Sequence, residues 1–193
     1  TVLDRYGTDY FVRSDIANTT EGYQKLMDVV KQRNITQKFV TTGEDISVGS
    51  TTLSVLWPSG NQIANVLGAS TSNLNDESVV FLLRYGSFDA LFPGDADIRV
   101  ESRWKNMQLA DDTLEVLKFP HHGSKTGMSE DFLELLDPQL AIISVGKNSY
   151  GHPNEATLAT LAKQGIRVKR TDKEGDIEIT SDGKEWEIVS KTK

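Results

Sequence analysis

Residues 92–97 read FPGDAD, residues 119–125 read FPHHGSK and residues 150–153 read YGHP, and each segment comes shortly after a run of apolar residues. We predict strands for these apolar runs, so that the polar segments follow strand ends. Strand ends are where a rigid scaffold presents polar groups to a ligand, and several of them can meet at one edge of a sheet. All three histidines of the chain, His121, His122 and His152, lie in these segments. We therefore expect this edge to carry a metal site.

Four side chains of these segments suit a divalent metal. Asp95 follows a glycine at a predicted strand end, where its two carboxylate oxygens can bridge two cations. His152 lies between a glycine and a proline just before a predicted helix, whose N-terminal end favours an anion such as phosphate. His121 and His122 can supply one ligand and one proton donor. This set of oxygen and nitrogen atoms suits zinc or manganese, whose bound water becomes hydroxide near neutral pH.

Each residue also has an ordinary structural interpretation. A Gly-Asp pair at a strand end is commonly a turn or a helix cap, and a single loop histidine need not bind anything. Ser124 and Lys125, beside the histidine pair, can contact phosphate, although Lys125 is also typical of a solvated side chain. Asp172 is typical of a turn, and we expect the tryptophans to pack in or near the core, at Trp57, Trp104 and Trp186. The confinement of every histidine to such loops favours the metal interpretation.

The composition predicts one soluble globular domain. The chain has 193 residues, 37% of them hydrophobic and 25% charged, with no run of 18 apolar residues and no signal peptide at Thr1. The absence of cysteine excludes thiolate metal sites, thiol catalysis and disulfides. The net charge of −7 argues against a broad surface that tracks nucleic-acid phosphates, although a bound cation can reverse the local sign.

Local sequence patterns predict a mixture of helices and strands. Thr19 or Thr20 and Ser129 are candidate N-caps, and Pro153 or Asn154 begins the last predicted helix. The pair Gly86-Ser87 predicts a hairpin turn, and residues 59–77 read as a long polar loop. The first seventeen residues read as loop with one short strand. We predict helices over 20–34, 98–110, 129–136 and 155–164, and strands over 38–41, 46–48, 51–57, 78–85, 88–92, 114–119, 140–145, 166–169, 177–180 and 185–189.

The segments LFPGD, VLKFPHHGSKTGMSEDFLELLDPQLAIISVGKNSYGHP and RVKRTDKEGDIEI resemble the C-terminal metallo-β-lactamase-fold domain of the ComEC competence proteins and related stand-alone hydrolases. The resemblance is close over residues 76–179 and looser over 20–34, 55–58 and 73–83. It implies an α/β fold, an αββα sandwich with a two-metal cleft at one edge. It also implies a hydrolase that acts on phosphodiesters, in particular a nuclease acting on DNA during competence and DNA uptake.

The resemblance implies roles for individual residues. Asp95 is similar to the bridging aspartate of the family and His152 to its last histidine ligand, so the metal ligands would be Asp95 and His152. His121 and His122 match the double-histidine loop of the cleft and would be catalytic, one of them stabilising or protonating the leaving oxygen. The cofactors would be two divalent ions, zinc or manganese.

The resemblance also implies where substrate is bound. Ser124 and Lys125 would steady the phosphate, and Asn75, with Ser78, matches a polar segment near the cleft. Residues 171–172 match a late motif to which we assign no role. The expected partner is DNA or another phosphodiester. Contact with a membrane would come only through parts of a parent protein that this sequence lacks, and no protein partner is inferred.

One departure from the family pattern matters more than these matches. The principal metal motif of the family, His-x-His-x-Asp-His or a close variant, occurs nowhere in the 193 residues. We expect residues 1–193 to form the C-terminal two-thirds to three-quarters of the family domain, incomplete at the N-terminus, which by itself binds metal weakly and is inactive. The alternatives are a catalytically degenerate binding module and a metallo-hydrolase of small esters, lactones or nucleotides. A parent of the ComEC type favours a membrane-tethered domain outside the cytoplasm, and a stand-alone relative would be secreted; a cytoplasmic location is the alternative.

Overall fold

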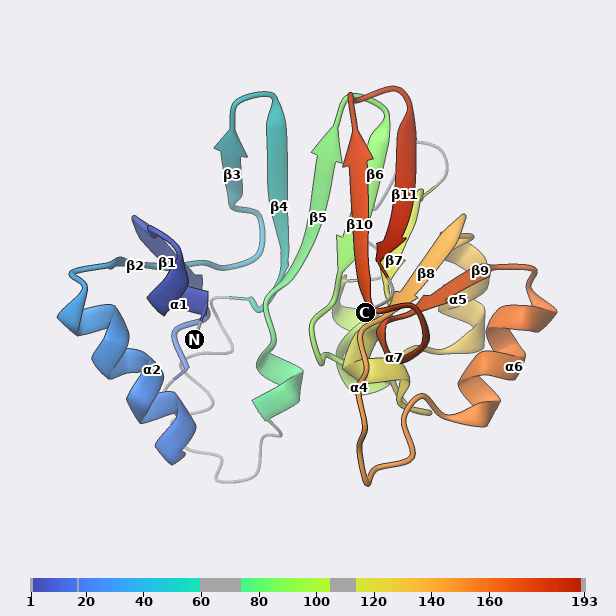
Figure 1. Cartoon of the computed structure of the whole chain (residues 1–193), viewed down its shortest axis with the longest axis horizontal. Helices are drawn as coiled ribbons and strands as arrows, with labels where there is room; N and C mark the ends of the chain where they lie inside the picture. Colours follow the sequence, from blue (N-terminus) through green and yellow to red (C-terminus); the bar gives the residue numbers. More distant parts are fainter. Residues whose placement is uncertain (1, 17, 60–73, 105–113, 192–193) are drawn as a thin grey trace.

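A seven-stranded mixed sheet organises the protein (Figure 1). The computed structural model describes residues 2–16, 18–59, 74–104 and 114–191. The strand order is β3-β4-β5-β6-β7-β8-β9, antiparallel from β3 to β6 and parallel from β6 to β9. The strands are β3 (Asp45–Val48), β4 (Thr51–Trp57), β5 (Val80–Tyr85), β6 (Phe88–Phe92), β7 (Val116–Lys118), β8 (Leu140–Ile143) and β9 (Arg167–Arg170).

The connections between strands explain why one edge of the sheet collects the polar segments. β5 and β6 form the predicted hairpin, in which Tyr85 pairs with Phe88 across a turn at Gly86, whose φ is 62°. The later strands are parallel and are joined by crossovers that contain α4 (Ile98–Trp104), α5 (Glu130–Leu136) and α6 (Glu155–Lys163). The carboxyl ends of β6, β7, β8 and β9 therefore lie at the same edge.

Both faces of the sheet are covered. On one face the helices pack against apolar strand residues, so that Leu82, Leu117, Phe132 and Leu161 are at most 2% exposed. The hairpin of β10 (Asp176–Ser181) and β11 (Trp186–Lys191) covers the other face, in front of the sheet in Figure 1. Its side chains Ile179, Trp186 and Ile188 pack on Phe88, Ala90, Val116 and Leu140. Helices, large sheet and hairpin form successive layers, which confirms the predicted α/β class.

The predicted helix starts are confirmed by their caps. The side chains of Thr20, Ser129 and Asn154 accept hydrogen bonds from backbone N–H groups in the first turns of α2 (Glu21–Gln32), α5 and α6. The predicted helix over 98–110 is described as far as Trp104, and residues 105–110 lie outside the described residues, as does the side chain of Trp104.

The N-terminal segments lie beside the β3–β4 end of the sheet (Figure 1). The predicted short strand is β1 (Tyr10–Arg13), which pairs in parallel with β2 (Thr36–Phe39). The pattern missed the helical turn α1 (Val2–Arg5), the turn α7 (Thr171–Glu174) and two 3-10 turns, η1 (Leu74–Glu77) and η2 (Pro120–Gly123). Of the long polar loop predicted over 59–77, residues 60–73 lie outside the described residues.

The tryptophans behave as expected where they are described: Trp57 is 4% exposed and Trp186 is half-buried on the hairpin face. None of the helices in the described ranges is long and apolar enough to cross a membrane.

Candidate metal-binding site

The fold brings Asp95 and the three histidines together. Asp95 follows β6, His121 and His122 form part of η2 directly after β7, and His152 lies in the loop between β8 and α6. Asp95 Oδ1 is 3.6 Å from His122 Nε2, and the ring centroids of His121 and His152 are 5.7 Å apart. The three segments FPGDAD, FPHHGSK and YGHP thus meet at one edge of the sheet, as the sequence predicts. Metal binding there stays a prediction.

The double-histidine segment has an unusual backbone. His121 and His122 have φ values of 49° and 55°, in the left-handed region that costs an L-residue about 1–2 kcal/mol. Neighbouring segments hold this conformation: the His121 N–H donates to Gly94 O at 3.1 Å, and the Asn154 N–H donates to Gly123 O at 2.8 Å. Backbone strain of this kind persists only where its surroundings over-determine it, and it clusters at functional sites.

The ring of His122 is anchored through one nitrogen. Its Nδ1 lies 2.7 Å from the carbonyl oxygen of Ser144, and because a carbonyl only accepts, Nδ1 carries the hydrogen. In the neutral ring this leaves Nε2, the atom that faces Asp95, with a free lone pair. A histidine whose second nitrogen donates to a carbonyl is typical of metal sites and of proton-transfer sites.

His121 and His152 each have a buried nitrogen without a partner among the described residues. His121 Nε2 lies 3.3 Å from the side-chain nitrogen of Asn75, but Nδ1 of His121 and Nδ1 of His152 are buried and make no hydrogen bond with any residue that the structure describes. Buried polar atoms are almost always paired, so an exception calls for an explanation such as an ion. The two orphaned nitrogens therefore fit a ligand bound between these segments.

Burial lowers the pKa of His152 below its ordinary value, and the nearby His121 and His122 lower it further, while Asp95 acts in the opposite direction. The neutral imidazole is thus favoured. It is also the form that offers a lone pair to a metal.

The donor chemistry fits zinc or manganese, since imidazole and carboxylate are ligands that these ions accept. Within the described ranges, however, no three His, Asp or Glu side chains are grouped closely enough to hold an ion by themselves. That the described residues are part of a larger donor set stays a prediction.

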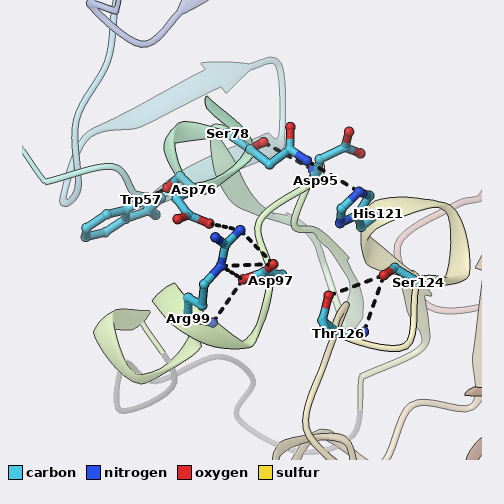
Figure 2. Close-up of polar contacts among 10 residues, drawn as sticks. Trp57, Asp76, Ser78, Asp95, Asp97, Arg99, His121, Ser124 and Thr126 are labelled. Carbon is cyan, nitrogen blue, oxygen red and sulfur yellow. Dashed lines mark hydrogen bonds and ion pairs between the residues drawn. The ribbon is translucent and has the colours of Figure 1, made fainter. Parts of the chain in front are cut away.

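A network of charged side chains, Asp76, Asp97 and Arg99, lies beside the candidate site. The sequence patterns did not single out these three residues. Figure 2 shows Arg99 between the carboxylates of Asp97 and Asp76, near Asp95 and His121. Arg99 pairs with Asp97 at 2.9 Å and with Asp76 at 3.0 Å. This network ties α4 to the segment 74–77, which also carries Asn75.

Burial and charge act on the network in opposite directions. Burial raises the pKa of Asp76 above its ordinary value, Arg99 opposes this, and the charge of Asp97 adds to the rise. For Asp97, burial acts upward as well, but the hydrogen bonds and charge of Arg99 hold the pKa of that carboxyl below its ordinary value. Arg99 is therefore what keeps Asp97, 4% exposed, in its ionised form.

The segment that carries Asn75 and Ser78 lies at the site, where the resemblance implies. Besides the contact of Asn75 with His121, the Asp95 N–H donates to Ser78 Oγ at 3.2 Å (Figure 2). Two sequence signals could have identified these carboxylates. Asp76 lies in the polar segment NLNDES just before β5, and Asp97 lies in FPGDAD, which follows β6.

Ser124 directly follows the double-histidine segment, and Lys125 lies at a neighbouring pocket. The Ser124 N–H donates to His121 O at 2.9 Å. Ser124 is 8% exposed, and its hydroxyl lies 3.3 Å from that of Thr126. Lys125 lines a pocket of about 260 Å³ between α5 and α6, together with Met128 and Thr160. The predicted contacts of this pair with phosphate stay a prediction.

A pocket of about 350 Å³ adjoins the site, lined by residues that include His122, His152, Lys147, Tyr150 and Thr171. Thr171 also closes the loop after β8, because its hydroxyl donates to Val145 O at 2.7 Å and accepts from Val145 N at 2.8 Å. Asp172, expected in a turn, lies in α7 and pairs with Arg170 at 2.7 Å.

The sequence is similar to three competence and recombination proteins. ComE operon protein 3 of Bacillus subtilis (strain 168) is 30% identical over 156 residues, which cover 80% of this chain and 19% of that protein. Competence protein ComA of Neisseria gonorrhoeae is 33% identical over 106 residues, covering 54% of this chain and 15% of that protein. Recombination protein 2 of Haemophilus influenzae is 34% identical over 109 residues, covering 54% of this chain and 13% of that protein.

The chain thus spans about a fifth or less of the length of these relatives. No protein-family model matches it. Among solved structures, CmlA, a diiron β-hydroxylase from Streptomyces venezuelae, superposes with a TM-score of 0.56 at 11% identity, over 89% of this chain and 40% of that chain. This likeness shows a shared fold and nothing about activity. With the strand-end segments gathered at one edge of a mixed sheet, the sequence similarities support a ComEC-like domain, similar to one part of these competence and recombination proteins.

Proposed function

We propose that this chain is part of a metal-dependent hydrolase that cleaves phosphodiesters, DNA in particular. The observation that carries the proposal is the meeting of Asp95, His121, His122 and His152 at one sheet edge, with two buried imidazole nitrogens unpaired. The names of the similar proteins, which refer to competence and recombination, fit a DNA substrate.

Asp95 and His152 would hold the metal, zinc or manganese. Bound divalent ions supply Lewis-acid polarisation of a phosphoryl oxygen and a nucleophilic water at neutral pH. The other donors of a complete site would come from a longer form of the domain, in which residues 1–193 are the C-terminal part. In a membrane-tethered parent of the ComEC type, the site would work outside the cytoplasm.

Other side chains of this chain would transfer a proton, orient a histidine ring and contact the phosphate. His122 is held through Nδ1 by Ser144 O, so that its Nε2 can carry a proton to the leaving oxygen. Asn75, through its contact with His121, would fix the ring of that histidine and border the substrate. Lys147, which lines the pocket beside His122, is better placed than Lys125 to meet a phosphate.

The test is DNA cleavage by the complete domain, a longer form that includes residues 1–193, with added manganese or zinc. We expect Asp95→Ala to abolish cleavage, because the substitution removes the carboxylate that lies 3.6 Å from the ring nitrogen of His122. Asp131→Ala, on the exposed surface of α5, is the matched control and should cleave as the wild type does. Undiminished cleavage by Asp95→Ala would reject the proposal.

The absence of a His-x-His-x-Asp-His motif from the sequence favours a second candidate, a module that binds nucleic acid or a partner without chemistry. Metal-dependent cleavage that Asp95→Ala removes would exclude it. A hydrolase of small esters, lactones or nucleotides is separated from a nuclease by comparing rates on single-stranded DNA and on a generic phosphodiester.

A further inference from the structure

The pocket beside His122 and His152 has a charge character unlike that of the whole chain. The chain carries a net charge of −7, yet among the described residues that line this pocket none is Asp or Glu. Its lining contains Lys147 and two histidines, together with backbone and side-chain groups of Ser144, Asn148 and others. The pocket is therefore suited to an anionic molecule that extends from the candidate metal-binding site.

One large aromatic side chain at this pocket is exposed. Tyr150 is 82% exposed, the largest exposure among the large hydrophobic side chains of the described residues. A single exposed tyrosine is ordinary on a protein surface. This one differs because it lies next to a candidate ligand and lines the pocket.

The loop that presents Tyr150 is locked by a single side chain. Asn148 Oδ1 accepts from the backbone N–H groups of Tyr150 at 3.0 Å and His152 at 3.1 Å. Its side-chain nitrogen donates to the carbonyl oxygens of Gly146 at 2.9 Å and His152 at 2.8 Å. The position of Tyr150 is thus set by the same side chain that sets the position of His152.

The ring of Tyr150 is also oriented. It lies nearly parallel to the ring of His152, with centroids 6.0 Å apart and an interplanar angle of 20°. Aromatic side chains on a positively charged groove are how proteins bind single-stranded nucleic acid, because every base has a face that can stack. A base in a duplex has both faces covered by its neighbours, so a fixed aromatic platform of this kind selects an unpaired base.

We propose that Tyr150 is a stacking platform for an unpaired base of the substrate, with Lys147 contacting a neighbouring phosphate, so that the site takes single-stranded nucleic acid or an unpaired end. This inference rests on the proposed function and names the form of its substrate. It assigns Tyr150 a role in binding and not in the chemical step.

Binding without metal tests the inference independently of cleavage. The probe is a fluorescein-labelled oligothymidylate, titrated with the whole chain in EDTA and followed by fluorescence anisotropy, beside a blunt-ended hairpin duplex. We expect the single strand to bind more tightly than the duplex, and Tyr150→Ala to weaken single-strand binding by about 10-fold or more. Tyr150→Trp, which keeps a stacking face, should bind as the wild type does. Lys147→Ala should weaken binding and reduce the salt dependence by about one counterion.

Tyr10→Ala is the matched control, since Tyr10 is 65% exposed on β1, away from the pocket, and its loss should leave binding unchanged. The inference is overturned if the wild type does not bind the single strand, if it binds both forms equally, or if Tyr150→Ala binds as the wild type does. Failure of the proposed function looks different: binding that depends on Tyr150, with no cleavage by the longer form of the domain when manganese or zinc is added, removes the hydrolase and keeps the platform.

Discussion

Gly123, which ends the double-histidine segment, packs against the chain that follows His152. Its φ is 82°, and a Cβ at this position would lie 2.6 Å from Pro153 Cβ. We expect Gly123→Ala to lower the free energy of unfolding by about 2 kcal/mol or more, from left-handed strain and overlap together. Denaturant titration measures this. Gly146→Ala is the control, because a Cβ there meets nothing within 4 Å. Equal stabilities of the two variants would contradict the packing described at Gly123.

The burial of Lys118 leads to a prediction about how the free energy of unfolding depends on pH. Burial on β7 lowers the pKa of Lys118 below its ordinary value of 10.5, while Asp95 opposes the change. The charged form is therefore disfavoured in the folded protein, and this penalty is complete below the folded pKa and disappears as the pH rises to 10.5. Lys118→Met should raise the free energy of unfolding at neutral pH, and the gain should shrink as the solution becomes alkaline.

Unfolding titrations at neutral and alkaline pH measure this gain. Lys184→Met, at an exposed position in the turn between β10 and β11, should show no such dependence. A gain for Lys118→Met that does not change with pH would mean that the buried charge is not its cause.

Individual residues differ in how far the sequence predicts them. Asp95 and the histidines are predictable because they follow apolar runs, and a strand end carries them to the sheet edge. The role of Arg99 is not predictable from the sequence. It depends on an ion pair with Asp76, which is 23 residues away in sequence and contacts Arg99 only in the folded protein. For Ser124 and Lys125, adjacency to the histidines in sequence does not decide which way a side chain points, so their contact with phosphate stays a prediction.

At the scale of elements, Ser129 both caps the start of α5 and binds the carboxylate of Glu101 on α4. Ser129 Oγ accepts from the Phe132 N–H, and both the N–H and the hydroxyl of Ser129 donate to the carboxylate of Glu101 on α4. Glu101 is 5% exposed. Ser129→Ala should therefore cost about 2–3 kcal/mol in the free energy of unfolding, the loss of a cap plus a buried carboxylate left short of a partner.

The comparison variant for this prediction is Thr20→Ala, a cap on the exposed start of α2 that should cost about 1 kcal/mol. Denaturant unfolding of both variants measures the difference. Equal losses would show that the contact between Ser129 and Glu101 adds nothing to the cap.

Elements with local signals were predicted closely, and elements set by distant contacts were not. The helices α2, α5 and α6 have their own caps and apolar spacing, and the β5–β6 hairpin has its own turn. By contrast, η2 contains two left-handed histidines that depend on Gly94 O and on the chain after Pro153. No local pattern predicts such a turn. The order of the strands in the sheet is likewise decided by packing.

At the scale of the whole molecule, the order of the strands in the sheet brings separate segments of the chain together at the candidate site. Parallel strands β6 to β9 end at one edge, and each of the first three is followed by a segment that carries a histidine or Asp95. The acidic balance of the chain suits a cation at this edge, which would also reverse the local sign for a phosphodiester. The sequence resemblance predicted this edge, whereas the Tyr150 pocket follows from the folded loop.

Anomalous X-ray diffraction from crystals grown with manganese measures directly whether Asp95 and His152 share an ion. The account predicts an anomalous peak about 2.0–2.3 Å from a carboxylate oxygen of Asp95 and from a ring nitrogen of His152, lost in crystals of Asp95→Ala. Crystals that show manganese elsewhere on the molecule and none between these two side chains would contradict it.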